Sequence, residues 1–573
     1  MMFQLAKKYR WQLLIILGIL VIQLVFAFQK EGYHMDELIS FEMANAEYNP
    51  WIVPTQPVGR LAKFVQEEIE ADSLGEKLGN ISNTIVDVLK NRGNSKMLSY
   101  KADVYEEPVW ISKAQFRDYL TTDGTDSFNY LSVYFNVKDD NHPPVHFMLL
   151  HTISSLFVGK IHPVMGCVIN IFMIICSAIV IMKCGMMLDK YGITSDGKGM
   201  RLGMLSALLY GCSQASVATM LLIRMYGVLT FLCLLTFYLQ MDKWWGRNFD
   251  KKNKLLIFVT VLGFWTQYFF LFYCIALSLA MVLALWRSKR IKELLVYIRS
   301  MLIAALIGVV GYPFAISDVF SSSRGVEALG NLRGGLGQYI QRLAAFGEIL
   351  LDRCFGNWVF GLIVVLAFLT AIIFLFIRQK LYRTEILLYC VPVLVYFLLA
   401  AKMSPMYVDR YLMAVFPFVI SWLVVALSVK SPSAGKTIRT VMGCLLVCYC
   451  LIQLLTYDGS YLYKGYQEQV AVSQEYKEKS CICLYEGSGY YDNLMEFINY
   501  EKTLLVTPEE LKNRKDTASV LYGTEFVMVV KNTVSQEQVE AILNQYDWNI
   551  KEILIEEGAH KDKVYLCENA CER

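Results

Sequence analysis

Long uncharged runs alternate with short basic loops along most of the chain. About 20 consecutive apolar residues are enough for a helix to cross the hydrocarbon core of a bilayer. The runs predict about eleven transmembrane helices, at Trp11–Phe28, Ile161–Met182, 202–241 (two helices), 255–286 (two short helices), Ser300–Ile316, Asn357–Ile377, Ile386–Ala401, Leu412–Val429 and Val441–Leu455. The pattern therefore predicts a mainly α, polytopic membrane protein, and a hydrophobic fraction of 55% over 573 residues agrees with this.

Residues 29–162 mix charged, aromatic and apolar positions without a run long enough to span a bilayer. We predict one large loop that contains interfacial helices. The apolar run at 145–158 has only 14 residues, which is too few for a crossing. Asn141 can cap the start of this helix, and Pro143-Pro144 suit its first turn, where a missing N–H group costs nothing.

The distribution of basic residues predicts the orientation, because cytoplasmic loops carry an excess of Lys and Arg. Basic residues precede the first span, so the N-terminus is predicted to be cytoplasmic. The run 202–241 has basic loops on both sides and a single charge, Arg224, near its middle. It therefore reads as a hairpin with Arg224 at its outer turn. If 145–158 crossed the membrane, every later basic loop would lie outside, so we predict that it does not cross.

The C-terminal part differs from the rest in charge. Residues 457–573 contain 12 Lys and Arg against 21 Asp and Glu, whereas residues 1–456 carry a net charge of +12. The two parts are therefore expected to face different compartments. Strand-like and helix-like runs alternate along 457–573, which predicts a small α/β domain outside the membrane. Four cysteines lie in this tail, and both a disulfide among them and free thiols fit the sequence: Cys481, Cys483, Cys567 and Cys571.

Four polar clusters fall on the predicted outer face. They are the Asp36-Glu37 pair after the first span, the region of His142, the triplet at Arg224, and the stretch 402–411. A carboxylate can remove a proton from a hydroxyl group, and Arg can bind phosphate oxygens in a bidentate manner. Together these groups suit a reaction at the membrane surface on a phosphate that carries a lipid tail.

Each cluster also has a structural explanation. Asp36-Glu37 could be a solvated acidic turn, Arg224 a snorkelling residue at a helix end, and Arg410 the partner of Asp409 in a salt bridge. The histidines of the 142–151 region could bind a metal, but no acidic residue completes a zinc set on that helix. Helix packing is the favoured role for these histidines, and no metal site is predicted.

The combination of motifs resembles the GT-C membrane glycosyltransferases, in the branch of the dolichyl-phosphate-mannose protein mannosyltransferases and the aminoarabinose transferases. The resemblance covers about residues 8–456 and rests on a long first loop opening with Asp-Glu, His142-Pro143-Pro144 before an amphipathic helix, Arg224-x-Tyr226, and Arg410-Tyr411 before Pro417.

The resemblance implies a GT-C fold and a sugar donor carried on a polyprenyl phosphate. It also implies an extracytoplasmic acceptor, which could be a glycan, a lipid or a protein, and inversion at the anomeric carbon. Asp36 would deprotonate the acceptor hydroxyl, and Glu37 would orient Asp36 or bind the acceptor. The donor phosphate would be held by residues of the basic motifs: Arg224, Tyr226, Lys402, Arg410 and Tyr411.

A second group of residues is assigned by the resemblance to a structural or acceptor-side role: His142, Pro143, Pro144, Gln267 and Tyr268. Gln267-Tyr268 stands where relatives often show His-Tyr, and this is a departure from the family pattern. The mechanism requires no cofactor, because cationic side chains can serve a monophosphate leaving group, and a divalent cation is left open. No nucleic-acid partner is expected.

The sequence thus predicts a polyprenyl-phosphate-sugar-dependent hexosyl- or pentosyltransferase in a bacterial plasma membrane, with its C-terminal domain outside the cytoplasm. The rival class is a transporter or lipid flippase. That class would need polar or helix-breaking residues at mid-membrane and two repeat-related halves. The polar clusters lie instead at one face, and the large first loop has no counterpart in the second half. An anchored receptor or scaffold is a third class, for which eleven spans would be excessive.

Overall fold

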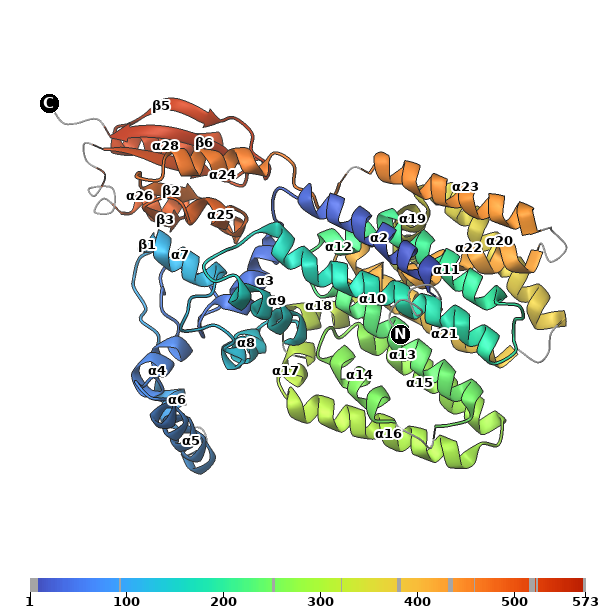
Figure 1. Ribbon diagram of the computed structural model, residues 1–573. Helices are drawn as coiled ribbons and strands as arrows, with labels where there is room; N and C mark the ends of the chain where they lie inside the picture. The colour runs from blue at the N-terminus through green and yellow to red at the C-terminus, as the bar shows by residue number, and fades with distance from the viewer. Residues whose placement is uncertain are drawn as a thin grey trace. The chain divides into compact units, whose positions relative to one another are not determined.

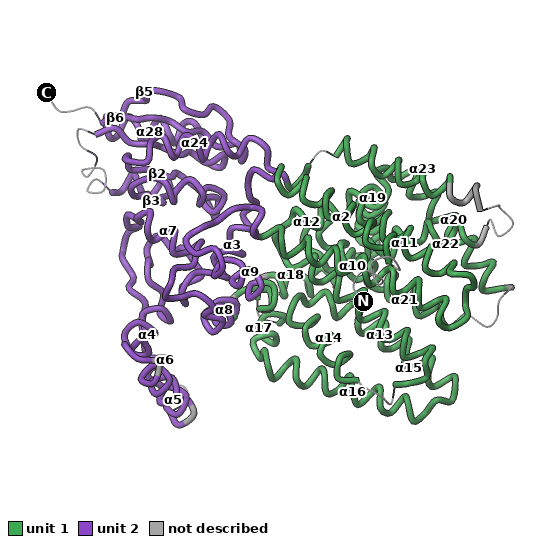
Figure 2. The backbone as a smooth tube through the Cα atoms, viewed as in Figure 1, with its two compact units in different colours: residues 1–29, 138–146, 166–461 green, residues 30–137, 147–165, 462–573 purple. Residues whose placement is uncertain are grey.

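The computed structural model describes residues 9–91, 94–249, 253–320, 322–378, 383–430, 436–457, 459–514, 521 and 524–569. The chain forms two compact units, each assembled from segments far apart in the sequence (Figure 2). Unit 1 comprises residues 1–29, 138–146 and 166–461, and unit 2 comprises residues 30–137, 147–165 and 462–573. The predicted domains, 1–456 and 457–573, are each continuous in the sequence. Unit 2, in contrast, combines most of the first loop with the tail.

Unit 1 is helical (Figure 1). Its helices are α2 (Arg10–Phe28), α10 (Pro163–Lys190), α11 (Lys198–Gly211), α12 (Gln214–Leu221), α13 (Tyr226–Gly246), α14 (Lys254–Phe264), α15 (Phe270–Arg287), α16 (Ile291–Gly311), α17 (Ala315–Phe320), α18 (Ser323–Leu332), α19 (Leu336–Phe355), α20 (Trp358–Arg378), α21 (Arg383–Met403), the 3₁₀ helix η4 (Asp409–Val415), α22 (Phe416–Lys430) and α23 (Lys436–Leu455). Helix α15 packs on α21, and α20 packs on α22.

Seven helices in the described part of the chain are long and apolar enough to cross a membrane, and the bent pair α11–α12 makes an eighth. Each of the eleven predicted spans corresponds to a helix of unit 1. Helix α13, the 11-residue α14 and the part of α23 at 441–455 are outside these limits of length and hydropathy. The protein is a multi-pass membrane protein, as predicted.

Breaks between the helices bring polar residues to helix ends. Helices α11 and α12 are bent by 56° where Ser213 caps the start of α12, a break that the sequence did not predict. Arg224 lies between the end of α12 and the start of α13, at the predicted turn. Helix α14 ends at Phe264 and α15 begins at Phe270, so the predicted turn near Gln267 is confirmed.

Unit 2 contains a six-stranded sheet with the order β1-β3-β2-β4-β6-β5. The strands are β1 (Trp110–Ser112), β2 (Cys481–Leu484), β3 (Lys502–Val506), β4 (Glu525–Val530), β5 (Trp548–Ile555) and β6 (Lys563–Asn569). The parallel central strands β3, β2 and β4 are almost wholly buried, as their continuous apolar sequences require. Val539 and Ile542 of α28 (Gln536–Tyr546) pack into the same core.

The predicted α/β tail is therefore confirmed, and its remaining helices are short: α24 (Tyr466–Glu475), the 3₁₀ helix η5 (Gly489–Asn493), α25 (Leu494–Phe497) and α26 (Pro508–Lys512). Cys481, Cys483 and Cys567 are buried free thiols, and Cys571 lies outside the described residues.

The first loop contributes helices and one strand to unit 2. The helices are α3 (Met35–Asn45), α4 (Arg60–Glu68), α5 (Leu74–Asn91), α6 (Lys96–Ser99), α7 (Lys113–Leu120), α8 (Tyr130–Asn136) and most of α9 (Val145–Leu156). The 3₁₀ helix η2 (Val137–Asp139) lies where the chain passes into unit 1. Strand β1 pairs in antiparallel fashion with β3, and Ile111 lies opposite Thr503.

The pairing of β1 with β3 constrains the topology, because two paired strands must lie on the same side of the membrane. The prediction places ten crossings between these strands, from α10 to α23, and ten is an even number. A crossing by α9 would make the number odd and would separate the strands. Helix α9 has only 12 residues. The pairing thus supports the prediction that residues 145–158 do not cross.

Candidate functional site

The acidic pair lies in unit 2 at the start of α3. His34 is the N-cap of this helix, and its Nδ1 accepts a hydrogen bond from the backbone N–H of Asp36 at 3.0 Å. The backbone N–H of His34 donates in return to Glu37 Oε2 at 2.7 Å. This reciprocal arrangement is a capping box, which satisfies two donors that a helix start otherwise leaves without a partner. It fixes the first turn of α3, where Asp36 stands.

Glu37 also forms a buried ion pair. Its Oε2 is 3.0 Å from Lys30 Nζ, and both side chains are fully inaccessible to solvent. Asp36 differs, because 22% of its side chain is exposed and its Oδ2 lies 3.6 Å from His34 Nδ1. Of the two acids, Asp36 is therefore the one that a ligand can reach, while Glu37 holds the helix start.

Arg224 lies in unit 1 and is buried beside His142. Its Nη2 is 3.2 Å from His142 Nδ1 and 3.4 Å from Nε2, and only 4% of the arginine is exposed. His142 Nδ1 is in turn 3.1 Å from Asp140 Oδ2. A tautomer with the proton on Nδ1 donates to Asp140 and leaves Nε2 to accept from Arg224. The structure thus brings two predicted residues together and adds Asp140 as the third member.

The local charges act on neighbouring groups. Burial alone would raise the pKa of Asp140, but the facing His142 and Arg224 outweigh it and hold the pKa below its usual range. Burial, aided by the charge of Arg224, lowers the pKa of His146 to about 3. His146 is therefore neutral at neutral pH, whereas Asp140 is ionised and balances the charge of the arginine.

The two Arg–Tyr motifs meet through their tyrosines. The ring centroids of Tyr226 and Tyr411 are 6.4 Å apart in an edge-to-face arrangement, although the residues are far apart in the sequence. The guanidinium of Arg410 lies over the ring of Tyr411, 5.3 Å from its centroid. Phe269, next to the Gln267-Tyr268 turn, also packs on Tyr411, with a centroid distance of 5.4 Å. We call Tyr226, Tyr411 and Phe269 the aromatic frame.

Asp409 was the competing partner for Arg410. The structure places Asp409 Oδ2 2.8 Å from Arg353 Nε, and Oδ1 accepts a hydrogen bond from Tyr461. Both oxygens of this buried carboxylate are therefore engaged by residues that the sequence did not single out. A simple Arg410–Asp409 salt bridge is not needed to explain either residue.

The remaining basic candidate makes different contacts. Lys402 Nζ donates to the carbonyl of Gly334 at 2.8 Å and lies 4.8 Å from the ring centroid of Tyr339. These contacts connect the end of α21 to the segment between α18 and α19. In the described part of the chain, the ammonium of Lys402 contacts these two residues rather than the aromatic frame, although the sequence places it only eight residues before Arg410.

The candidates with a structural or acceptor-side role lie around helix starts and turns. Pro143 and Pro144 are buried ahead of α9, and the N–H of Val145 donates to the carbonyl of Trp265 at 3.0 Å. Gln267 Oε1 accepts from the N–H of Tyr268 at 2.7 Å. The hydroxyl of Tyr268 donates to Asp318 Oδ2 at 2.5 Å, and burial together with this bond raises the pKa of Tyr268.

Sequence reasoning missed three acids or bases of this region, namely Asp140, Arg353 and Asp318. Asp140 precedes His142 by two residues, and this spacing is a signal that points to Asp140 as a partner of the histidine. Arg353 and Asp318 lie between the predicted spans Ser300–Ile316 and Asn357–Ile377, where the structure has α17, α18 and α19. In the described ranges, no group of three or more His, Cys, Asp or Glu side chains is placed to hold a metal ion.

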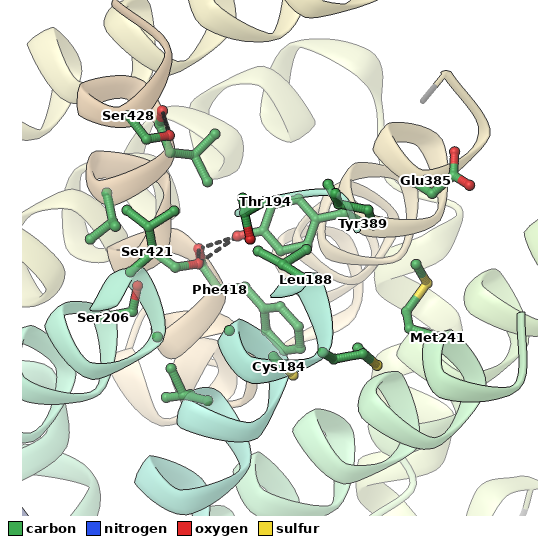
Figure 3. Close-up of a pocket in the computed structure, with 18 of the residues that line it drawn as sticks. Cys184, Leu188, Thr194, Ser206, Met241, Glu385, Tyr389, Phe418, Ser421 and Ser428 are labelled. Carbon is green, nitrogen blue, oxygen red and sulfur yellow. Dashed lines mark hydrogen bonds between the residues drawn. The ribbon is translucent and has the colours of Figure 1, made fainter. Parts of the chain in front are cut away.

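Unit 1 also contains a cavity of about 530 Å³ between α10, α11, α13, α20, α21 and α22 (Figure 3). Its walls are mostly apolar, with Leu188, Met241 and Phe418 among them. The hydroxyl of Tyr389 points to Ser421, with 2.5 Å between the two oxygens, and also donates to the carbonyl of Phe418 at 2.9 Å. The predicted site residues, all of which the structure describes, do not line this cavity, so it is not part of the candidate site.

Structural comparison identifies the fold. The chain is similar to the aminoarabinose transferase ArnT from Cupriavidus metallidurans bound to undecaprenyl phosphate, with a TM-score of 0.52, 11% identity, and 97% of this chain and 98% of that chain covered. The apo state of that enzyme gives 0.45, with 11% identity and coverage of 74% and 87%. An Archaeoglobus fulgidus oligosaccharyltransferase tethered with an acceptor peptide gives 0.39, with 11% identity and coverage of 94% and 68%.

No protein-family model and no curated protein sequence matches the chain. The structural likeness to ArnT bound to undecaprenyl phosphate nevertheless extends over nearly the whole of this chain and of the ArnT chain. The protein therefore has the GT-C fold, and the resemblance drawn from its motifs is confirmed at the level of the fold.

Proposed function

We propose that this protein of GT-C fold is an inverting glycosyltransferase, which moves a sugar from a polyprenyl-phosphate-linked donor to an extracytoplasmic acceptor. One observation carries the proposal: the carboxylate of Asp36 is exposed at a fixed helix start, while its neighbour Glu37 is fully buried in an ion pair. A rigid, accessible carboxylate is what a general base requires.

In the proposed reaction, Asp36 accepts the proton of the acceptor hydroxyl. The acceptor oxygen then attacks the anomeric carbon, and the bond from that carbon to the phosphate oxygen breaks with inversion. The polyprenyl phosphate leaves with the bonding electrons. Arg224 and Arg410 hold this phosphate as its negative charge develops, because a guanidinium binds two oxygens at once in a water-poor site.

The donor side of the site is supported by the aromatic frame. Arg224 is followed by Tyr226 and Arg410 by Tyr411, and the two tyrosine rings are in contact. In the proposal, this contact sets the two arginines at the separation that one phosphate needs. Lys402 adds a third cation. The undecaprenyl phosphate bound to ArnT supports a lipid phosphate as the ligand class.

Other residues would act by positioning. His142 and Asp140 orient the guanidinium of Arg224, and Glu37 holds the turn that carries Asp36. Pro143, Pro144, Gln267 and Tyr268 shape the approach to the site on the acceptor side. The acceptor belongs to the glycans, lipids or proteins outside the cytoplasm, and the membrane is the plasma membrane of a bacterium.

The test uses membranes that contain the full-length protein and a radiolabelled polyprenyl-phosphate sugar. Asp36→Asn is expected to abolish transfer of the label to envelope acceptors and to leave donor binding intact, because the amide cannot accept the proton. Asp72→Asn changes an exposed acid of the same unit and serves as the matched control.

Undiminished transfer by Asp36→Asn would overturn the assignment of the base. A protein that moves the labelled lipid across the membrane without breaking the sugar–phosphate bond would be a flippase. Intact donor recovered on the opposite leaflet, with no labelled acceptor, would therefore overturn the proposed activity itself.

A further inference from the structure

The C-terminal segment Leu462–Tyr466 lies against the turn that leads to Asp36, and both belong to unit 2. The backbone N–H of Glu31 donates to the carbonyl of Leu462 at 2.8 Å. The N–H of Gly465 donates to the Glu31 carboxylate at 2.7 Å. Gly465 has a φ of +84° and is the N-cap of α24, so Glu31 lies at the positive end of that helix.

The same two segments are in close steric contact. A Cβ atom on Gly32 would lie 2.6 Å from Cβ and Cγ of Tyr466, which is closer than carbon atoms can approach. Tyr466 cannot easily move aside, because it is buried and its hydroxyl donates to the carbonyl of Asp492 at 2.8 Å. Glycine at position 32 is therefore a requirement of this packing.

Tyr463 makes the contact that matters for charge. Its ring lies 4.9 Å from Lys30 Nζ, measured to the ring centroid. The same ring is 6.3 Å from the ring of His34 and 6.1 Å from that of His560. Tyr463 has a φ of +50°, a backbone conformation that non-glycine residues adopt only where the surroundings impose it.

Lys30 connects Tyr463 to the first turn of α3. Its ammonium lies between the face of Tyr463 and the carboxylate of Glu37, and the ion pair is fully buried. Glu37 accepts from the N–H of His34, and His34 accepts from the N–H of Asp36. A continuous set of contacts therefore runs from the C-terminal segment to the residue proposed as the base.

We propose that Tyr463 is a positioning residue for Asp36, so that the C-terminal segment is a working part of the catalytic site. The face of its ring holds Lys30 against Glu37, and this pair fixes the helix start from which Asp36 projects. The inference rests on the proposed role of Asp36. It assigns to the tail a function in the reaction that is separate from acceptor binding.

The cation–π contact distinguishes positioning from simple packing, because it requires an aromatic face and not merely volume. Tyr463→Leu keeps most of the apolar bulk and removes the face. Tyr463→Phe and Tyr463→Trp keep the face and remove the hydroxyl. Tyr476→Leu makes the same change at the far end of α24 and is the matched control.

Initial rates are measured with the full-length protein in membranes over a range of donor concentrations. Tyr463→Leu is expected to lower kcat about tenfold with the donor KM unchanged, because only the position of the base is disturbed. Tyr463→Phe, Tyr463→Trp and Tyr476→Leu are expected to stay within about twofold of the wild type. An unaltered kcat for Tyr463→Leu, or an equal loss in Tyr463→Phe, would overturn the inference.

A double-mutant cycle tests whether Tyr463 acts through Lys30. If it does, Lys30→Met with Tyr463→Leu is no slower than Lys30→Met alone, whereas independent effects would multiply. Hydrogen exchange of the amides at 30–40 gives a readout that needs no activity: Tyr463→Leu should speed it and Tyr463→Phe should not. Faster exchange together with an active Asp36→Asn variant would refute the proposed base but leave the positioning role of Tyr463 intact. Unchanged exchange would refute that positioning role.

Discussion

The candidate residues of the two units are held in opposite ways. Around Asp36 in unit 2, the contacts that fix the first turn of α3 join residues between positions 30 and 37. In unit 1, the contacts of Arg224 reach back to His142, and Tyr226 touches Tyr411, 185 positions further along the sequence. The hydrogen bonds and the ion pair near Asp36 are local, and Tyr463 packs on them from far along the sequence, whereas the contacts of Arg224 and Tyr226 are all long-range. A change at residues 30 to 37 should therefore act on the first turn of α3, and a change near Arg224 should act through distant helices.

The acids of the two units also differ in their electrostatics. Asp140 in unit 1 faces a histidine and an arginine, which outweigh burial and lower its pKa. Its contribution to stability is thus present above the usual aspartate range and is lost only as the pH falls through the lowered value. In unit 2, burial raises the pKa of Glu42 well above its usual range and that of Glu496 to about 8. Asp140 of unit 1 is therefore ionised despite its burial, whereas burial favours the protonated form of Glu42 and Glu496 in unit 2.

The largest expected effect comes from breaking the buried ion pair of Lys30 and Glu37 in unit 2. Glu37→Gln would leave the ammonium of Lys30 buried without its counter-charge. Removing one partner of a buried pair costs about 3 to 5 kcal/mol in the free energy of unfolding. Thermal unfolding of the purified protein in detergent measures this loss. The control is Glu70→Gln, in the exposed pair of Glu70 with Lys77, which should cost less than about 1 kcal/mol. Equal losses in both variants would mean that the buried pair does not hold the helix start.

The next largest effect is expected in unit 1, where long-range contacts hold Arg224. Arg224→Gln is expected to lower kcat/KM by about 10²- to 10³-fold, because a preorganised donor to the developing charge is removed. Arg324→Gln, in an exposed pair with Glu327, is the control and should leave kcat/KM unchanged. Binding of an unreactive polyprenyl phosphate should weaken in Arg224→Gln and not in Asp36→Asn. If both variants bind it equally, the division between a donor half and a base half is wrong.

The smallest expected effect concerns the protonated acids of unit 2. Glu496 is fully buried, and Asn493 donates to its Oε1 at 2.8 Å. The carboxyl keeps its proton to a pH of about 8 in the folded state but would lose it near 4.5 when unfolded. Folding then takes up a proton between these values, and the stability of the protein falls as the pH rises through this window.

Glu496→Gln should therefore flatten the dependence of the unfolding temperature on pH between about 5 and 8. The exposed Glu537→Gln is the control and should keep the slope of the wild type. An unchanged slope in Glu496→Gln would show that this carboxyl is ionised in the folded protein.

Much of the fold could be predicted because apolar runs determine it locally. The alternating runs predicted along 457–573 are strands and helices in the structure, β2 and α28 among them. Strand β1 was missed, because three residues in a polar loop become a strand only when β3 is present beside them. The bend at Ser213 was also missed, because the run around it carries no charge that would mark a break.

In the candidate site, too, local features could be predicted from the sequence and distant contacts could not. The residue types at Asp36, Arg224 and His142 pointed to chemistry, but the contact between Arg224 and His142 joins residues 82 positions apart, which no local pattern predicts. Lys402 was grouped with Arg410 because they are close in the sequence, yet its ammonium contacts Gly334 and Tyr339. Its part in phosphate binding stays a prediction, as do the roles of the other site residues.

The pairing of β1 with β3 also sets an order of biosynthesis. The ribosome makes Trp110 of β1 about 390 residues before it makes Leu504, the residue that pairs with it. In the predicted topology, the first loop is until then on the far side of the membrane without its partner strands, while the translocon inserts the helices between them. Local contacts form early and distant ones late, so the loop is exposed to proteases throughout this interval. A nascent chain arrested before residue 502 should consequently be cleaved near β1, and completion of the tail should end this sensitivity.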